Sequence, residues 1–196
     1  MKRKTACFIA LILAMGLSAC SSQNVNNIGK TTVYVETDGN IVHTIVEDFG
    51  MPYYEEEGLR QKAEADVSSY NEETGREAVA MTSLKVENQI VKLQMTYENA
   101  DDYTAFNNED LFVGTIAEAL AAGYDLKYDL KNPLNENDTI GEHELLTMQD
   151  KHIVIAENAL RLRTEAKVLY ASVDADFIDE YEVDAYENDG VTVIIY

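Results

Sequence analysis

Hydrophobic and polar residues alternate in several short segments of this chain, a pattern typical of half-buried β-strands. Two such segments, 32–37 and 41–47, flank Asp38-Gly39, a dipeptide preferred in two-residue hairpin turns because both positions need positive φ. We therefore expect the folded part to begin near Thr32 with a hairpin. The expected pairs on one face are Val35 with Val42 and Val33 with Thr44.

Two further hairpins are predicted. Residues 79–98 place a two-residue loop at Asn88-Gln89, and a shift by one residue would set Lys85 and Glu87 among apolar partners. The third hairpin has a three-residue loop at 188–190, with glycine at the left-handed position. The expected pairs are Val86–Val91, Leu84–Leu93, Thr82–Met95 and Ala80–Tyr97 in the second hairpin, and Ala185–Val193 and Val183–Ile195 in the third.

Helical spacing of apolar residues predicts two main helices. The first covers 55–71 and ends near Gly75, with glutamates in its first turn, where the helix dipole favours anions. Asn99 is a predicted N-cap of a short turn. The second helix covers about 109–122, and Gly123 is its expected C-cap. The stripes are Leu59, Ala63, Val67 and Tyr70 in the first helix, and Phe112, Ile116, Ala119 and Leu120 in the second.

The remaining pattern completes a single domain. Residues 152–155 and 167–171 are expected to be strands, and 126–137 are irregular, with Pro133 excluding helix. Several hairpins and few helices predict an α+β fold. Its mainly antiparallel sheet would be built from hairpins, with the two main helices packed on one face.

The N-terminus has the features of an export signal. Three basic residues precede an apolar run at 6–17, which as a helix spans about 18 Å and is too short for a hydrocarbon core of about 30 Å. Leu17-Ser18-Ala19-Cys20 then resembles the lipobox of bacterial lipoproteins. In such proteins the signal is cut before the cysteine, whose sulfur carries a diacylglyceryl thioether. A plain signal peptide with an incidental cysteine is the alternative.

Lipidation of Cys20 would divide the chain into three parts. Residues 1–19 are the expected signal peptide, 20–31 the lipidated cysteine and a polar, flexible spacer, and 32–196 the single domain. Two acyl chains hold a protein stably on a membrane. Because Cys7 is removed with the signal, no thiol is left for a disulfide, a nucleophile or a metal.

Several segments resemble one group of proteins. The lipobox, VYVETDG with IVEDF soon after it, LFVGTIAEALAAGY at 111–124 and KVLYAS at 167–172 look like a family of uncharacterised surface lipoproteins from anaerobic Gram-positive bacteria. The resemblance implies attachment to the extracytoplasmic face of the cell membrane and one folded domain. It implies no activity and no catalytic residue.

Charge excludes one class of partner. The chain has 36 Asp and Glu against 15 Lys and Arg, a net charge of −21. Nucleic acid is not an expected partner, because phosphate binding needs clustered basic residues. Anionic lipid and wall polymers would be repelled within a Debye length of about 8 Å. The expected partners are the membrane, through the lipid anchor, and an envelope protein or a glycan.

No catalytic motif was found in the sequence. His143-Glu144 begins like the zinc motif H-E-x-x-H, but Thr147 stands where the second histidine is needed. His43 and His152 lie on strand-like segments and are expected to be packed or surface residues. The usual nucleophile-elbow, penicillin-binding and nucleotide-binding patterns are absent as well. We therefore expect no enzyme and no cofactor.

Acidic and aromatic residues leave three weaker hypotheses open. A glycosidase-like pair of carboxylates would make the protein a surface hydrolase. Asp174 and Asp176, about 7 Å apart on one face of a strand, could share Ca²⁺ and support adhesion, although the EF-hand pattern is not met. Tyr53-Tyr54 could stack on a sugar ring. The favoured hypothesis remains a lipid-anchored, non-catalytic binding or envelope-associated module.

Overall fold

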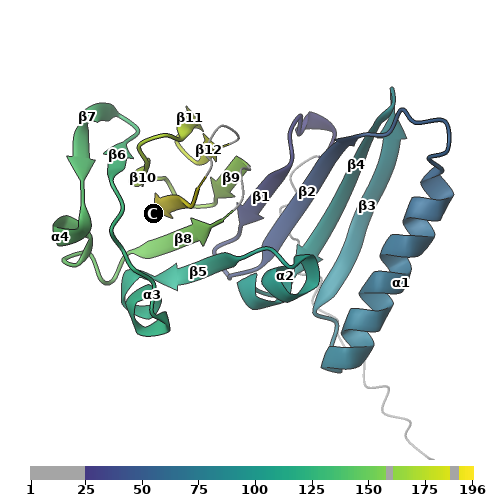
Figure 1. Cartoon of the computed structure of the whole chain (residues 1–196), viewed down its shortest axis with the longest axis horizontal. Coiled ribbons are helices and arrows are strands. Elements are labelled where there is room, and N and C mark those ends of the chain that lie inside the picture. Colours follow the sequence, from purple (N-terminus) through teal and green to yellow (C-terminus); the bar gives the residue numbers. More distant parts are fainter. Residues whose placement is uncertain (1–24, 158–160, 186–189) are drawn as a thin grey trace, which may run out of the picture.

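The computed structural model describes residues 25–157, 161–185 and 190–196. Within these ranges the chain forms two sheets of mostly antiparallel strands together with helices (Figure 1). The α+β class is as the sequence predicts. The predicted signal peptide and Cys20 lie outside the described residues.

The first sheet has seven strands and the second has six. In spatial order the first contains β11 (Asp176–Asp179), β12 (Glu182–Asp184), β9 (Arg161–Thr164), β1 (Thr32–Val35), β2 (Ile41–Asp48), β4 (Ile90–Tyr97) and β3 (Val79–Glu87). The second contains β5 (Leu111–Thr115), β8 (His152–Ala156), β13 (Thr192–Ile195), β10 (Tyr170–Ser172), β6 (Leu130–Asn132) and β7 (Asn135–Ile140). The helices are η1 (Val25–Asn27), α1 (Glu56–Thr74), α2 (Ala100–Asn107), α3 (Ile116–Ala122) and α4 (Glu142–Leu145). Only β1 and β9 run parallel among the described pairs of strands.

The first hairpin forms, but its predicted register is wrong by one residue. Val35 lies opposite Ile41, not Val42. The loop has three residues, because the amide of Glu36 donates to the carbonyl oxygen of Asn40 (3.0 Å) and Gly39 takes the left-handed conformation at φ 91°. Glycine reaches this conformation without the steric cost that a side chain would add.

The second hairpin confirms the predicted register next to its turn. Asn88 and Gln89 both have positive φ, and the predicted pairs Val86–Val91 and Leu84–Leu93 are present. A β-bulge at Thr82 then shifts the pairing, so that Met81 lies opposite Met95 and Val79 opposite Tyr97. The predicted pairs Thr82–Met95 and Ala80–Tyr97 are therefore wrong. The bulge directs Val79 and Met81, which are more apolar than Ala80 and Thr82, toward the core.

The third predicted hairpin is wrong. Val183 is on β12 in the first sheet, whereas Val193 and Ile195 are on β13 in the second. All four residues of β13 are buried, because it is a central strand with β8 on one side and β10 on the other. Such a strand needs partners on both sides, which a terminal hairpin does not supply. The predicted loop lies largely outside the described residues.

The helices follow the prediction in part. α1 ends at Gly75 in the left-handed conformation, and the side chain of Asn99 caps α2 by accepting from the amide of Asp102. The predicted helix 109–122 is wrong in its first half, where Leu111–Thr115 forms β5 against β8. Thr115 and Glu118 form a capping box that begins α3 only at Ile116.

The two predicted main helices do not share one face. α1 contacts β3 of the first sheet, whereas α3 contacts β5 and β8 of the second. A hydrophobic cluster joins the two sheets, with Val33 and Ile41 from the first and Val154 and Ile194 from the second. A second cluster packs α3 and α4 on the second sheet. No helix in the described ranges is long and apolar enough to cross a membrane.

The segment before β1 is packed, not extended. Val25 in η1 is buried, and Lys92 Nζ on β4 donates to the carbonyl oxygens of Ile28 (2.6 Å) and Val25 (3.4 Å). The backbone amide of Val46 donates to the hydroxyl of Thr31 (3.0 Å). Residues 25–31, predicted from the sequence to be part of the spacer, therefore contact the first sheet, and the packed part of the chain begins before Thr32.

α1 covers the outer edge of β3. The side chain of Asn71 accepts from the amide of Val79 (3.0 Å) and donates to its carbonyl oxygen (2.8 Å). An uncovered edge strand would present unpaired backbone groups to other chains. The helix therefore closes this edge of the sheet.

We expect Asn71→Ala to lower the free energy of unfolding by about 2 kcal/mol, because it removes two hydrogen bonds. Urea denaturation would measure the loss. Ser68→Ala is the matched control, since Ser68 is an exposed residue on the same helix whose hydroxyl donates to Glu72 of that helix and not to β3. Equal effects of the two substitutions would contradict the proposed role of Asn71 at the edge.

Candidate functional site

A groove of about 320 Å³ lies on the face of the first sheet that points away from the core. Met95 and Tyr97 on β4 point into the core, so Gln94 and Thr96, which alternate with them, point to the opposite face. We call it the acidic groove. Its lining residues are Glu36, Asn40, Val42, Glu77, Ala78, Ala80, Thr82, Gln94, Thr96, Tyr97 and Glu98.

The floor of the acidic groove is fixed by hydrogen bonds. Gln94 is only 3% exposed, and its side-chain amide accepts from the hydroxyl of Thr82 (3.1 Å) and donates to that of Thr44 (3.2 Å). These bonds join β3, β4 and β2 across the sheet. The floor is therefore preformed, which lowers the entropic cost of binding a ligand.

Three glutamates and no basic residue contribute to the lining of this groove: Glu36, Glu77 and Glu98. Glu98 forms an ion pair with Arg76, and the same guanidinium donates to Asp102 Oδ1 (2.6 Å). Among the described residues, no ion pair is formed by Glu36 or Glu77. The groove therefore attracts cations and repels anions.

Glu36 is the buried member of this group. Its pKa is raised, first by burial and then by repulsion from Asp38 and Glu165. A bound cation would offset this rise, because an opposite charge nearby favours the ionised carboxylate. Glu36 reaches the groove because it follows β1 at the hairpin and alternates with the core residue Val35.

None of the three histidines lines the acidic groove. His43 is packed as predicted, with both ring nitrogens unpartnered, its ring at 5.3 Å from that of Tyr103, and a pKa lowered to about 4 by burial. His152 stacks on Tyr196. His143 is exposed on α4, and its neighbour Glu144 accepts from the amide of Gly141. The incomplete zinc motif therefore serves as a helix cap.

The calcium candidates Asp174 and Asp176 are both exposed on either side of the buried Ala175. No group of three or more potential metal ligands occurs in the described part of the chain. A millimolar calcium titration that raises the melting temperature would support the weak site, and this stays a prediction.

Three acidic residues that follow these candidates, on β11 and β12, form ion pairs with arginines of β9. Arg163 contacts Asp179 (3.1 Å) and Glu182 (3.0 Å), and Arg161 contacts Asp184 (2.8 Å). The sequence did not suggest these pairs, because the arginines lie on β9, about twenty residues earlier, and meet the acids only through sheet pairing.

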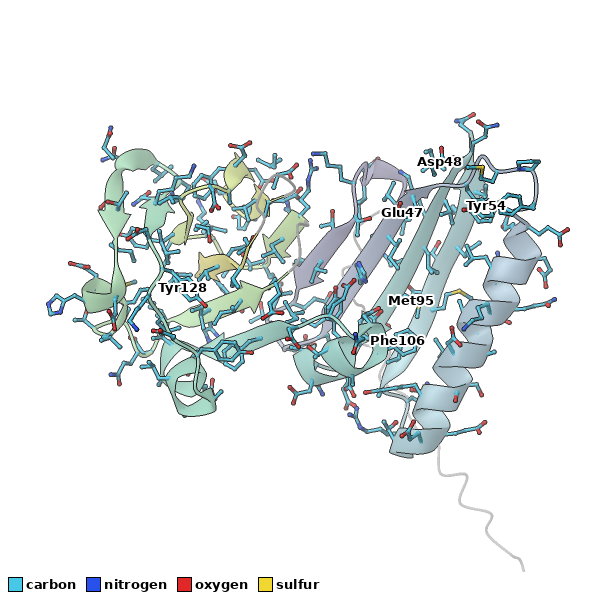
Figure 2. All side chains as sticks on the ribbon, in the orientation of Figure 1. Glu47, Asp48, Tyr54, Met95, Phe106 and Tyr128 are labelled. Atoms are coloured by element: carbon cyan, nitrogen blue, oxygen red, sulfur yellow. The ribbon has the colours of Figure 1, made fainter. Side chains whose placement is uncertain are left out.

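An exposed aromatic loop, residues 49–54, joins β2 to α1. The Tyr54 ring lies 5.0 Å from the rings of both Phe49 and Tyr53, and Tyr53 is 72% exposed. The amide of Tyr54 donates to the carbonyl oxygen of Met51 (3.0 Å), and that of Phe49 to Gln89 (2.6 Å). Figure 2 shows Tyr54 at the same end of the first sheet as Glu47 and Asp48. The loop thus holds apolar side chains in a fixed, outward position.

Comparisons with known proteins add no identification. No protein-family model matches the chain, and neither curated proteins nor solved structures show a significant match. The predicted resemblance to surface lipoproteins therefore stays a prediction, and the site has to be interpreted from its own chemistry.

Proposed function

We propose that this protein is a lipid-anchored, extracytoplasmic binding module that takes a cationic ligand into the acidic groove. The observation that carries the proposal is a preformed concave surface lined by three glutamates and no basic residue. A ligand with one or more amines would find carboxylates at the rim and small side chains, such as Ala80 and Thr96, at the floor. The lipobox-like sequence around Cys20 supports the proposed location at the membrane.

The size of the groove supports a small ligand or a side chain of a larger one. A volume of about 320 Å³ is at the lower end of the range for small-molecule sites. Its polar floor is already satisfied by internal hydrogen bonds, so specificity would come mainly from the rim charges. A basic segment of an envelope protein would satisfy the same chemistry.

Spermidine is a suitable probe for the groove. We expect its binding, measured by calorimetry at constant ionic strength, to weaken about tenfold in the double variant Glu36→Gln/Glu77→Gln. The double variant Glu64→Gln/Glu142→Gln, at exposed residues on α1 and α4 outside the groove, is the matched control for the loss of two negative charges. If the control weakened spermidine binding as much, the effect would be due to non-specific charge attraction, which would contradict a binding site in the groove.

The anchor needs a separate experiment. Mass spectrometry of the protein extracted from the cell envelope should find a mature chain that begins at Cys20 with a diacylglyceryl thioether. Cys20→Ala should remain unprocessed or leave the membrane fraction. A mature chain with an unmodified Cys20 in the cytosol would overturn the proposed location.

A carboxylate-pair hydrolase is a second candidate, favoured by the raised pKa of Glu36 within the groove. A general acid needs such a pKa, and Glu98 beside Arg76 would be the second carboxylate. Hydrolysis of nitrophenyl glycosides that falls by about 100-fold in Glu36→Gln would support this candidate. Hydrolysis unchanged by the substitution would exclude Glu36 as the acid.

A further inference from the structure

η1, the first element that the structure describes, and the exposed aromatic loop lie toward the same end of the first sheet. η1 is held by Lys92, which lies opposite Val46 in the pairing of β4 with β2. The loop begins at Phe49, three residues after Val46, a distance of about 10 Å along the strand. The chain therefore enters the fold close to the base of the loop.

Covalent geometry limits how far this end can be from a membrane. Five residue steps separate Cys20 from Val25 and span at most about 17 Å. A lipidated Cys20 would thus hold η1, and with it the end of the sheet that carries the exposed aromatic loop, close to the lipid headgroups. Leu134, at the turn of β6 and β7, belongs to the other sheet, but this turn lies on the same side of the molecule as the loop, whereas α3 lies on the opposite side (Figure 1).

The side chains of the loop suit the boundary between lipid and water. Met51, Tyr53 and Tyr54 are the large apolar side chains that it exposes, and tyrosine combines an apolar ring with a hydroxyl that stays hydrated. Carboxylates surround the loop, with Glu47 and Asp48 before it and Glu55 after it. Burial of these charges in hydrocarbon would be costly, so contact is limited to the headgroup layer.

We propose that the exposed aromatic loop at 49–54 makes a second contact with the bilayer that holds Cys20, and so orients the domain on the membrane. The proposal rests on the proposed lipid anchor. It predicts shallow insertion, strongest on a neutral lipid surface, because the surrounding carboxylates are repelled by anionic lipid. The acidic groove would then keep a fixed orientation relative to the membrane.

The protein has no tryptophan, so a single introduced tryptophan is a unique fluorescent reporter. The experiment uses the full chain with Tyr53→Trp, purified in its lipidated form and reconstituted into phosphatidylcholine vesicles. We expect a blue-shifted emission that is quenched by brominated phosphatidylcholine. Met51→Trp provides a second reporter in the same loop. Ala122→Trp, at an exposed residue of α3 on the opposite side of the molecule (Figure 1), is the matched control.

The outcomes separate the two proposals. Mass spectrometry of the same sample establishes whether Cys20 is lipidated. A Cys20 without the lipid would overturn the proposed anchor itself. With lipidation present, unshifted and unquenched emission from both loop reporters would overturn the membrane contact alone. Equal quenching of Ala122→Trp would show contact without orientation and also contradict the proposal. A response of the loop to soluble wall glycan, with none to vesicles, would assign the loop to sugar binding instead.

Vesicle composition gives an independent check. Replacement of part of the phosphatidylcholine by phosphatidylglycerol should reduce the quenching of Tyr53→Trp at low salt, and added salt should restore it. Stronger quenching on the anionic vesicles would contradict the predicted effect of the carboxylates around the loop.

Discussion

Replacement of Tyr97 by alanine should lower the free energy of unfolding by about 4 kcal/mol. Tyr97 is 1% exposed, and its ring lies edge-on to those of Tyr103 (5.2 Å) and Phe106 (5.8 Å). Its hydroxyl donates to Asn107 Oδ1 (3.2 Å). The truncation would leave a cavity between β4 and α2 and remove two aromatic contacts, each worth about 1 kcal/mol beyond the buried area. Because a domain of this size is stable by about 5 to 15 kcal/mol, the effect would be a large fraction of the total.

Urea denaturation monitored by circular dichroism would measure this change. Tyr97→Phe is the matched control, since it keeps the ring and removes only the hydrogen bond to Asn107, at a cost of about 1 kcal/mol. If alanine were no more destabilising than phenylalanine, the ring would not be what holds α2 to the first sheet.

The second large effect is a dependence of stability on pH through His43. Burial lowers the pKa of His43 to about 4 in the folded protein, whereas its usual value is 6.5. Between these values the unfolded chain binds the proton more readily, so stability falls as the pH decreases from about 6.5 to about 4. The difference of 2.5 pKa units corresponds to about 3 kcal/mol. Above pH 6.5 this contribution is fully present.

His43→Phe isolates this contribution from that of the many carboxylates. Phenylalanine keeps an aromatic ring beside Tyr103 and removes two buried nitrogens that have no partner. We expect the stability difference between wild type and variant to change by about 3 kcal/mol between pH 7 and pH 4. His143→Gln, at an exposed residue, is the matched control for loss of a histidine. A constant difference between wild type and His43→Phe would show that His43 does not titrate on unfolding.

Local sequence predicted those features that local interactions determine. The turn at Asn88-Gln89, the cap at Asn99 and the helix end at Gly75 each depend on a few neighbouring residues. The β1 register failed by one residue because Asp38-Gly39 suits both two- and three-residue loops, and only the hydrogen bond between Glu36 and Asn40 distinguishes them.

Other features depend on partners far away in the sequence. Phe112 and Ile116 have helical spacing, yet Phe112 lies on β5, because β8 provides an antiparallel partner at Ile155. β12 and β13 likewise belong to different sheets because β12 pairs with β9 and β13 with β8, and the local sequence does not indicate these distant partners.

The acidic groove could not be predicted for the same reason. Glu36 lies about forty residues before Glu77, and neither belongs to a motif. They line one groove because β2 pairs with β4 and β4 with β3, and because Glu98 follows β4 directly. A chain with 36 acidic residues offers many such pairs, so only the fold identifies the relevant ones.

The parallel pairing of β1 with β9 affects the timing of folding. Strand β1 (32–35) cannot form its parallel pairing until β9 (161–164) is available, so this part of the first sheet forms late. Contacts between such distant segments slow folding, because a long loop must be ordered before they form. If the protein is exported as we propose, much of the chain would pass through the translocation channel before the first sheet is complete. Slow formation of this sheet would help to keep the chain unfolded during export.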